Sequence, residues 1–252
     1  MPFGGAGSRR ERAERVRGLL DAQLRFAVSL SQLRGEPLER GVATYTNFHR
    51  RFGYGTAPAA PSAPGWLAFV DELCAARDDD ARLACALRHF ELGGEEQPMP
   101  GHRIFGCFSY TPPEDDGGVR IHFIDRDPAD GPGPLSSTRT AQRRTELQEM
   151  VRDVRAMHPS ARTIHGRSWL YHRPAYRRLF PDSYLATSEP VARVDRYAGS
   201  SLWGQFQTHT GIDAAACARF VDGLGALEAD APWRVFPLLP LTVSAPIEAF
   251  VG

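Results

Sequence analysis

The sequence contains no lysine: all 30 of its basic residues are arginine, and 30 acidic residues bring the formal net charge to zero. Without a lysine amine there is no pyridoxal Schiff base, no aldolase-type imine and no phosphate-binding loop that ends in Gly-Lys. The zero net charge also argues against a dedicated nucleic-acid-binding protein. The composition therefore excludes lysine-dependent catalysis and disfavours nucleic-acid binding.

Long apolar runs and paired cysteines are also missing. No stretch approaches the roughly 18 apolar residues of a membrane span, and the first 20 residues lack the apolar core of a signal peptide. The four cysteines contain no C-x-x-C pair, which is not typical of a disulfide scaffold or a zinc ribbon. We therefore expect a cytoplasmic protein with reduced, mostly buried thiols at Cys74, Cys85, Cys107 and Cys217.

Familiar catalytic motifs are absent as well. The sequence has no G-x-S-x-G, and its Gly-x-Gly pairs are isolated and lie in turn-like segments, so neither a hydrolase elbow nor a Rossmann site is indicated. His158, His165 and His172 follow one another at intervals of seven but fall in segments of different expected structure. The sequence predicts no metal site and no cofactor.

What is present is typical of a soluble globular protein, with 42% hydrophobic and 24% charged residues. Apolar spacing predicts helices over the first hundred residues, the first of them opened by Ser8 and Glu11 as a capping box. The expected helices span residues 8–34, 37–52, 66–76 and 81–92, with a loop at 56–64.

From about residue 103 the pattern changes to strands mixed with helices. We expect strands at 103–110, 119–124, 162–170, 184–188 and 200–206, helices at 137–157 and 174–180, a helix from Asp213 to 227, and an extended tail from 233. This order predicts an α+β fold: an N-terminal helical layer followed by a mixed sheet with packed helices. We expect a helical part over 1–100 and an α+β part over 101–252, joined in one compact unit.

Arginine is concentrated between Ser136 and Tyr197, a segment that contains twelve arginines and only six acidic residues. Guanidinium groups suit carboxylate, sulfate or phosphate, so this region predicts a site for an anionic substrate or a face for an acidic partner protein. The alternative is a set of solvated, ion-paired helix faces. For Arg167, which lies between a strand and an aromatic run, we favour the binding site.

The densest segment runs from Ile164 to Phe180. On a strand, Arg167, Trp169 and Tyr171 would share one face, with Ser168 and Leu170 on the other. The first three would form a pocket wall in which aromatic rings give shape and arginine gives charge, or the rings would be core residues. Both readings stay open. The expected substrate-binding residues are Arg167, Ser168, Trp169, Tyr171 and Arg177, together with Trp203 and Gln205 on a second strand.

His122 lies in an expected strand, and Asp125 follows three residues later. A histidine near a carboxylate can act as a general base close to neutral pH, so we predict that His122 and Asp125 transfer the proton. A histidine in a strand is also commonly a core residue with its hydrogen bonds satisfied.

Several segments together carry a resemblance: FGCFSY, VRIHF, GRSWLYHRPAYRRLFP and LWGQF. From about Phe105 onward they are similar to a family of bacterial proteins of unassigned function with the pattern SWLYN-x-x-AYRRLFP, then LWGQF. His172 replaces the family's asparagine, and the tail around Phe250 lacks its aromatic pair. The departures indicate a specialised member, and the family supplies no reaction.

In size and composition the chain also resembles proteins of azinomycin-type antibiotic pathways that close an aziridine ring. This resemblance implies an amine that displaces a sulfate-type leaving group within one substrate, carried on an acidic carrier protein, with a partner protein that stabilises the enzyme. We therefore expect a cofactor-independent enzyme of bacterial specialised metabolism that acts on an anionic or carrier-bound substrate. The alternatives are a non-catalytic scaffold that docks an acidic partner, and an acyltransferase-like enzyme with an anion cradle near residues 137–140.

Overall fold

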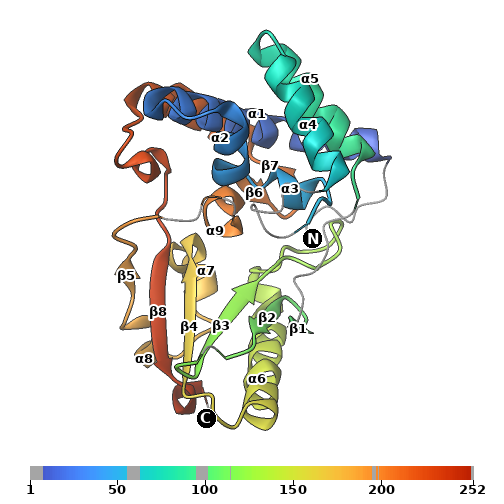
Figure 1. Ribbon diagram of the computed structural model, residues 1–252. Helices are drawn as coiled ribbons and strands as arrows, with labels where there is room; N and C mark the ends of the chain where they lie inside the picture. Colours follow the sequence, from blue (N-terminus) through green and yellow to red (C-terminus); the bar gives the residue numbers. More distant parts are fainter. Residues whose placement is uncertain are drawn as a thin grey trace. The chain divides into compact units, whose positions relative to one another are not determined.

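The computed structural model describes residues 8–55, 63–94, 102–113, 115–194, 197 and 199–250. The chain divides into two compact units (Figure 1). Among the described residues, unit 1 comprises those between 102 and 192 and between 238 and 250, and unit 2 comprises those between 8 and 94 and between 193 and 237. The expected division at residue 100 differs from this one, because residues 193–237 group with the N-terminal helices and the chain forms two units rather than one.

Unit 2 is built on the long helix α1 (Arg9–Arg34). The Ser8 hydroxyl accepts a hydrogen bond from the Glu11 N–H while the Glu11 carboxylate accepts one from the Ser8 N–H, which confirms the predicted capping box. Phe26 on α1 is fully buried, and its ring packs against Trp203, Phe220 and Phe236 at centroid distances of 5.3–5.9 Å. Residues 193–237 therefore complete the core beneath α1.

Four further helices of unit 2 come from the first hundred residues: α2 (Leu38–Tyr45), α3 (Phe48–Arg51), α4 (Pro64–Ala75) and α5 (Asp79–Leu92). The second segment contributes α9 (Ser200–Trp203), η3 (Gly204–Phe206), β6 (Gln207–Thr208), β7 (Gly211–Ile212), α10 (Ala214–Asp222), η4 (Gly223–Ala226) and η5 (Pro232–Val235). Asp213 caps α10 by accepting a hydrogen bond from the Ala216 N–H, as predicted.

Two predictions for unit 2 are wrong. Residues 37–52 form two helices, because the Thr46 hydroxyl bonds back to the Val42 carbonyl (2.7 Å) and the Asn47 N–H donates to Gln23 (2.8 Å) instead of continuing the helix. Residues 200–206 form a helical turn rather than a strand. The predicted loop at 56–64 falls mostly outside the described residues.

Unit 1 contains a six-stranded sheet in the order β1-β2-β3-β4-β8-β5. The strands are β1 (Arg103–Phe105), β2 (Phe108–Thr111), β3 (Gly118–Phe123), β4 (Thr163–Ser168), β5 (Glu189–Pro190) and β8 (Leu241–Pro246). Only β3 and β4 pair in parallel, and the other neighbours are antiparallel. The sheet is therefore mixed, and the fold is α+β, as the sequence predicts.

The apolar side chains of unit 1 gather on one face of this sheet. Strand residues such as Phe108, Ile121, Ile164 and Val243 form one buried cluster with the helices α6 and α8. The helical segments of unit 1 are η1 (Ser137–Arg139), α6 (Thr140–Met157), η2 (Trp169–His172), α7 (Pro174–Arg177), α8 (Asp182–Leu185) and η6 (Ile247–Phe250). The buried cluster also contains residues of α6, η2, α7, α8 and η6. These helical segments therefore cover one face of the sheet, which is its core face.

Three predicted strand boundaries in unit 1 are wrong. Residues 103–110 form two strands, because Gly106 turns the chain in the left-handed region with φ at 56°. Strand β4 ends at Ser168 and not at residue 170. Residues 184–188 form no strand and belong to α8 and the turn after it. The tail, which is expected to be extended, contains the strand β8. Across the described ranges, no helix is both long and apolar enough to cross a membrane.

Candidate functional site

The face of the sheet opposite the core is polar, and we call it the polar face. Along β3 and β4 the side chains alternate, so Val119, Ile121 and Ile164 turn to the core while their neighbours turn to the other face. The polar face includes Ser109, Thr111, Arg120, His122, His165, Arg167, Thr242 and Ser244. The register also places Ile104 of β1, Thr163 of β4 and Glu189 of β5 on this face.

The pairing register brings the basic groups of this face together. Arg120 on β3 is the direct neighbour of His165 on β4. Two residues further along these parallel strands come His122 and Arg167, again on the polar face. Two guanidinium groups and two imidazole groups therefore project from adjacent strands, and ligands of open sheets commonly bind where parallel strands end.

His122 has polar neighbours on β2 and an aromatic neighbour before β1. Its Nε2 lies 3.0 Å from the Thr111 hydroxyl, and its ring stacks on His102 at a centroid distance of 4.7 Å. Ser109 is its direct partner across the strands and is 1% exposed. The Ser109 hydroxyl has no hydrogen-bond partner within the part of the chain that the structure describes.

Room for the His165 ring comes from a glycine. A Cβ at Gly118 would lie 3.2 Å from the His165 Cε1 and Nδ1, closer than ordinary side-chain contacts. The Gly118 N–H donates to the Asp116 carboxylate (2.7 Å), which fixes the start of β3. A side chain at position 118 would therefore crowd the His165 imidazole, and glycine leaves it room.

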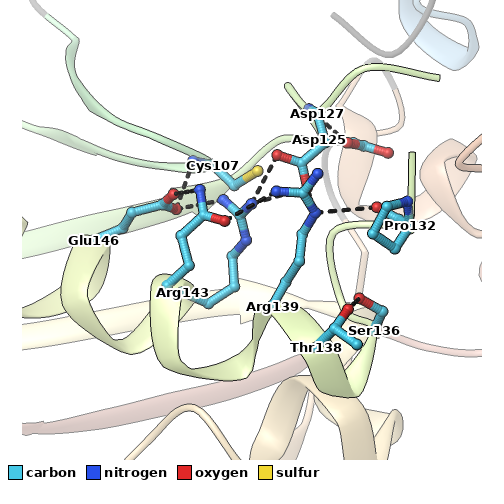
Figure 2. A network of polar contacts seen from close by, with 10 residues as sticks. Cys107, Asp125, Asp127, Pro132, Ser136, Thr138, Arg139, Arg143 and Glu146 are labelled. Carbon is cyan, nitrogen blue, oxygen red and sulfur yellow. Dashed lines mark hydrogen bonds and ion pairs between the residues drawn. The ribbon is translucent and has the colours of Figure 1, made fainter. Parts of the chain in front are cut away.

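A network of charges lies where the chain leaves β3 (Figure 2). Arg143 on α6 is 1% exposed, and one of its nitrogens donates to both Asp127 oxygens at 2.7 and 2.8 Å. Arg143 also binds Glu146, whose carboxylate accepts the Cys107 N–H at 3.0 Å. Asp125 accepts a hydrogen bond from the Asp127 N–H (3.1 Å). This network ties the loop after β3 to the start of α6.

The contacts within this network indicate a structural role rather than a metal-binding site. One oxygen each from Asp125 and Asp127 and the Cys107 sulfur lie within 4.8 Å of one another. However, Arg143 holds both Asp127 oxygens and Arg139 forms a second ion pair with Asp127 at 3.1 Å. A cation there would have to displace guanidinium groups. Burial raises the pKa of the Cys107 thiol to about 11, so that thiol is protonated at neutral pH.

The predicted aromatic wall is not on the polar face. The Ser168 hydroxyl accepts the Leu170 N–H (3.1 Å) and starts the turn η2, so the strand alternation stops before Trp169 and Tyr171. Tyr171 is a core residue whose hydroxyl meets the Tyr184 hydroxyl at 2.8 Å. The shared face predicted for Arg167, Trp169 and Tyr171 is therefore wrong.

The side chains that follow β4 contact one another or the backbone. Arg173 lies over the Trp169 ring at 5.5 Å, and Arg177 donates to the Tyr171 carbonyl (3.4 Å). Backbone carbonyls also accept hydrogen bonds from Arg144, Arg162 and Arg178. Much of the arginine-rich region therefore has a structural role.

Trp203 and Gln205 belong to unit 2. Trp203 is fully buried among aromatic rings, and Gln205 donates to the Leu202 carbonyl (2.9 Å). Because both lie in helical turns, their predicted common strand face does not exist.

Residues 137–140, predicted to hold an anion in an acyltransferase-like enzyme, lead into α6 through one 3₁₀ turn. In this segment the Ser136 and Thr138 hydroxyls contact each other at 3.0 Å.

Sequence reasoning missed His102, Ser109, Arg120 and His165 as members or neighbours of the polar face. The period-two alternation in VRIHF and in TIHGR indicates them, once β3 and β4 are known to be adjacent. It also missed a thiol, imidazole and carboxylate group in unit 2, formed by Glu72, Cys85 and His89. The spacing of four residues between Cys85 and His89 on an expected helix was the available signal.

The chain matches no protein-family model, and comparisons with curated proteins and with solved structures found no match either.

Proposed function

We propose that the polar face binds the anionic group of a small-molecule or carrier-linked substrate, and that the protein is an enzyme. The observation that carries this proposal is the placement of Arg120, His122, His165 and Arg167 on one face of adjacent parallel strands. Guanidinium groups supply charge and paired donors for sulfate, phosphate or carboxylate, and imidazole supplies a group that exchanges protons near neutral pH.

The proposed reaction is an intramolecular displacement in specialised metabolism. A substrate amine attacks a carbon that bears a sulfate-type group; the new C–N bond forms as the C–O bond breaks, and the electron pair leaves with the sulfate oxygen. His122 accepts the proton that the nitrogen loses, while Arg167 stabilises the departing anion. The reaction involves no net oxidation or reduction and uses no bound cofactor. We place it in the cytoplasm.

Asp125 has a different place in this scheme. Its carboxylate accepts the Asp127 N–H in the loop directly after β3, beside the network of Arg143. We assign it to shaping that loop, and we assign proton transfer to His122 because His122 lies on the polar face with Arg167.

Anion binding tests the proposal without a known substrate. Sulfate and phosphate are titrated against chloride at constant ionic strength, and binding is followed by calorimetry. Arg167→Ala should weaken binding about 10- to 100-fold, the cost of one charge-assisted contact. The matched control is Arg152→Ala, which removes an equal charge from the exposed side of α6.

The two outcomes are distinct. If Arg152→Ala weakens binding as much as Arg167→Ala, the effect is general charge and not a site. If neither variant differs from the parent protein, the polar face does not hold the anion and the proposal fails.

A further inference from the structure

A second group of reactive side chains lies in unit 2, between α4 and α5. Cys85 and His89 are four residues apart on α5 and share one side of that helix. Glu72 comes from α4 and reaches both of them: one of its oxygens lies 3.0 Å from the His89 Nε2 and 3.6 Å from the Cys85 sulfur. Two helices thus bring a thiol, an imidazole and a carboxylate to one point.

These separations match the edges of a tetrahedral metal site. A zinc ion with ordinary bond lengths holds its nitrogen and oxygen ligands about 3.4 Å apart and its sulfur and oxygen ligands about 3.6 Å apart. All three candidate ligand atoms lie within 4.8 Å of one another. An ion can therefore be accommodated with small side-chain movements and no change of the helices.

The imidazole is already oriented for this role. Its other nitrogen, Nδ1, lies 3.1 Å from the Tyr54 hydroxyl, so Tyr54 fixes the ring with Nε2 toward Glu72. Metal-bound histidines usually have such a polar partner on the second nitrogen. The Tyr54 contact is independent of the other two ligands, and it selects the nitrogen that faces them.

The burial of the Cys85 thiol is not typical of a catalytic cysteine. Cys85 and His89 are 3% and 4% exposed, whereas the Glu72 side chain is 46% exposed. The pKa of the Cys85 thiol is raised to about 11, mainly by burial, so the metal-free thiol is not an activated nucleophile. The exposed carboxylate leaves one side of the group open to water.

We propose that Cys85, His89 and Glu72 bind a divalent zinc-type ion through the cysteine sulfur, the histidine Nε2 and a glutamate oxygen, with water as the fourth ligand. On binding, the thiol releases its proton to solvent, and the neutral imidazole carries its N–H on Nδ1 toward the Tyr54 hydroxyl, so that Nε2 is open to the ion. The ion joins α4 to α5 and stabilises unit 2. Arg88 contacts the same Glu72 oxygen, so its guanidinium competes with the metal.

Cobalt tests the site through its colour. The protein is treated with a chelator, dialysed and titrated with Co²⁺; one equivalent should produce the near-ultraviolet absorption of a thiolate–cobalt bond, and Zn²⁺ should remove it by competition. Zinc should also raise the midpoint of thermal unfolding, because it binds only the folded site. This readout is independent of any enzymatic activity.

Variants make the assignment specific. Cys85→Ser and Glu72→Gln should remove the absorption. Cys74→Ser should keep it, because the Cys74 thiol is exposed and lies 3.8 Å from Glu39, outside the proposed site. Arg88→Gln should tighten zinc binding because the competing cation is gone, and Tyr54→Phe should weaken it about 10-fold. Circular dichroism checks folding, and if Cys85→Ser does not fold, the exposed Glu72→Gln decides.

The proposal fails if the parent protein shows no cobalt–thiolate absorption at one equivalent, if the absorption survives in Glu72→Gln, or if Cys74→Ser abolishes it. None of these results depends on the anion site of unit 1, so the two proposals stand or fall separately.

Discussion

At the scale of single residues, Gly106 leaves the space that the Glu146 carboxylate occupies. Its φ of 56° favours glycine, and a Cβ there would lie 2.0–2.3 Å from the Glu146 carboxylate. Gly106→Ala should therefore destabilise the fold by about 3 kcal/mol or more, since strain and a displaced buried charge add. Urea unfolding measures the change.

Gly35 is the matched control for that substitution. It caps α1 with a φ of 61°, but nothing lies within 4 Å of its Cβ position. Gly35→Ala should cost only the backbone strain, about 1 kcal/mol. Equal losses in the two variants would mean that the Glu146 contact has no energetic weight.

The same scale explains which site residues the sequence predicts. His122 and Arg167 are identified as candidates from their residue types and expected strands, and the polar face contains both. Trp169 and Tyr171 are not on it, because one hydroxyl, that of Ser168, captures the Leu170 N–H and ends the strand. A local side-chain to backbone bond of this kind competes with the ladder and leaves no periodic signal in the sequence.

At the scale of elements, α6 is fixed to the sheet by charge as well as by apolar packing. Arg143 binds Asp127 in the loop after β3 and Glu146 on its own helix (Figure 2). Arg143→Met should cost about 3–5 kcal/mol, because the buried Glu146 carboxylate then loses its ion pair and Asp127 keeps only its ion pair with Arg139. Arg152→Met on the exposed side of α6 should stay within about 0.5 kcal/mol of the parent protein.

Chemical denaturation of both variants checks this prediction. A small loss in Arg143→Met, close to that of Arg152→Met, would show that water reaches the carboxylates and that packing alone fixes α6.

Element length decides how well the sequence predicts the fold. Long periodic segments such as α1 and α6 are predicted to within a few residues, because many positions repeat the helical spacing. Short apolar runs at 184–188 and 200–206 carry too few positions to separate a strand from a helical turn. Strand β8 escapes prediction because Pro240 and Pro246 flank and end it, and its place beside β4 is set by tertiary pairing.

At the scale of the whole molecule, the chain returns to unit 2 after building most of unit 1. The core beneath α1 needs residues that come 177 and 210 positions later, since Phe26 packs on Trp203 and Phe236. No local pattern announces such a pairing, and for this reason the sequence predicts a division near residue 100 but not the membership of 193–237.

This membership makes a prediction about fragments. Residues 6–97 alone keep Tyr45 but lack Trp203, Phe220 and Phe236 as aromatic partners of Phe26, and they should not unfold cooperatively in urea, because a helix that loses most of its apolar contacts is marginal. Residues 6–97 joined to 193–237 through a glycine-serine linker of about 15 residues, with a reach of roughly 20 Å, should regain a cooperative transition. Circular dichroism and tryptophan fluorescence follow both fragments. A sharp transition in residues 6–97 alone, at the same midpoint as in the joined fragment, would contradict the discontinuous core, whereas recovery that is lost again in Phe236→Ala would assign it to the contact with α1.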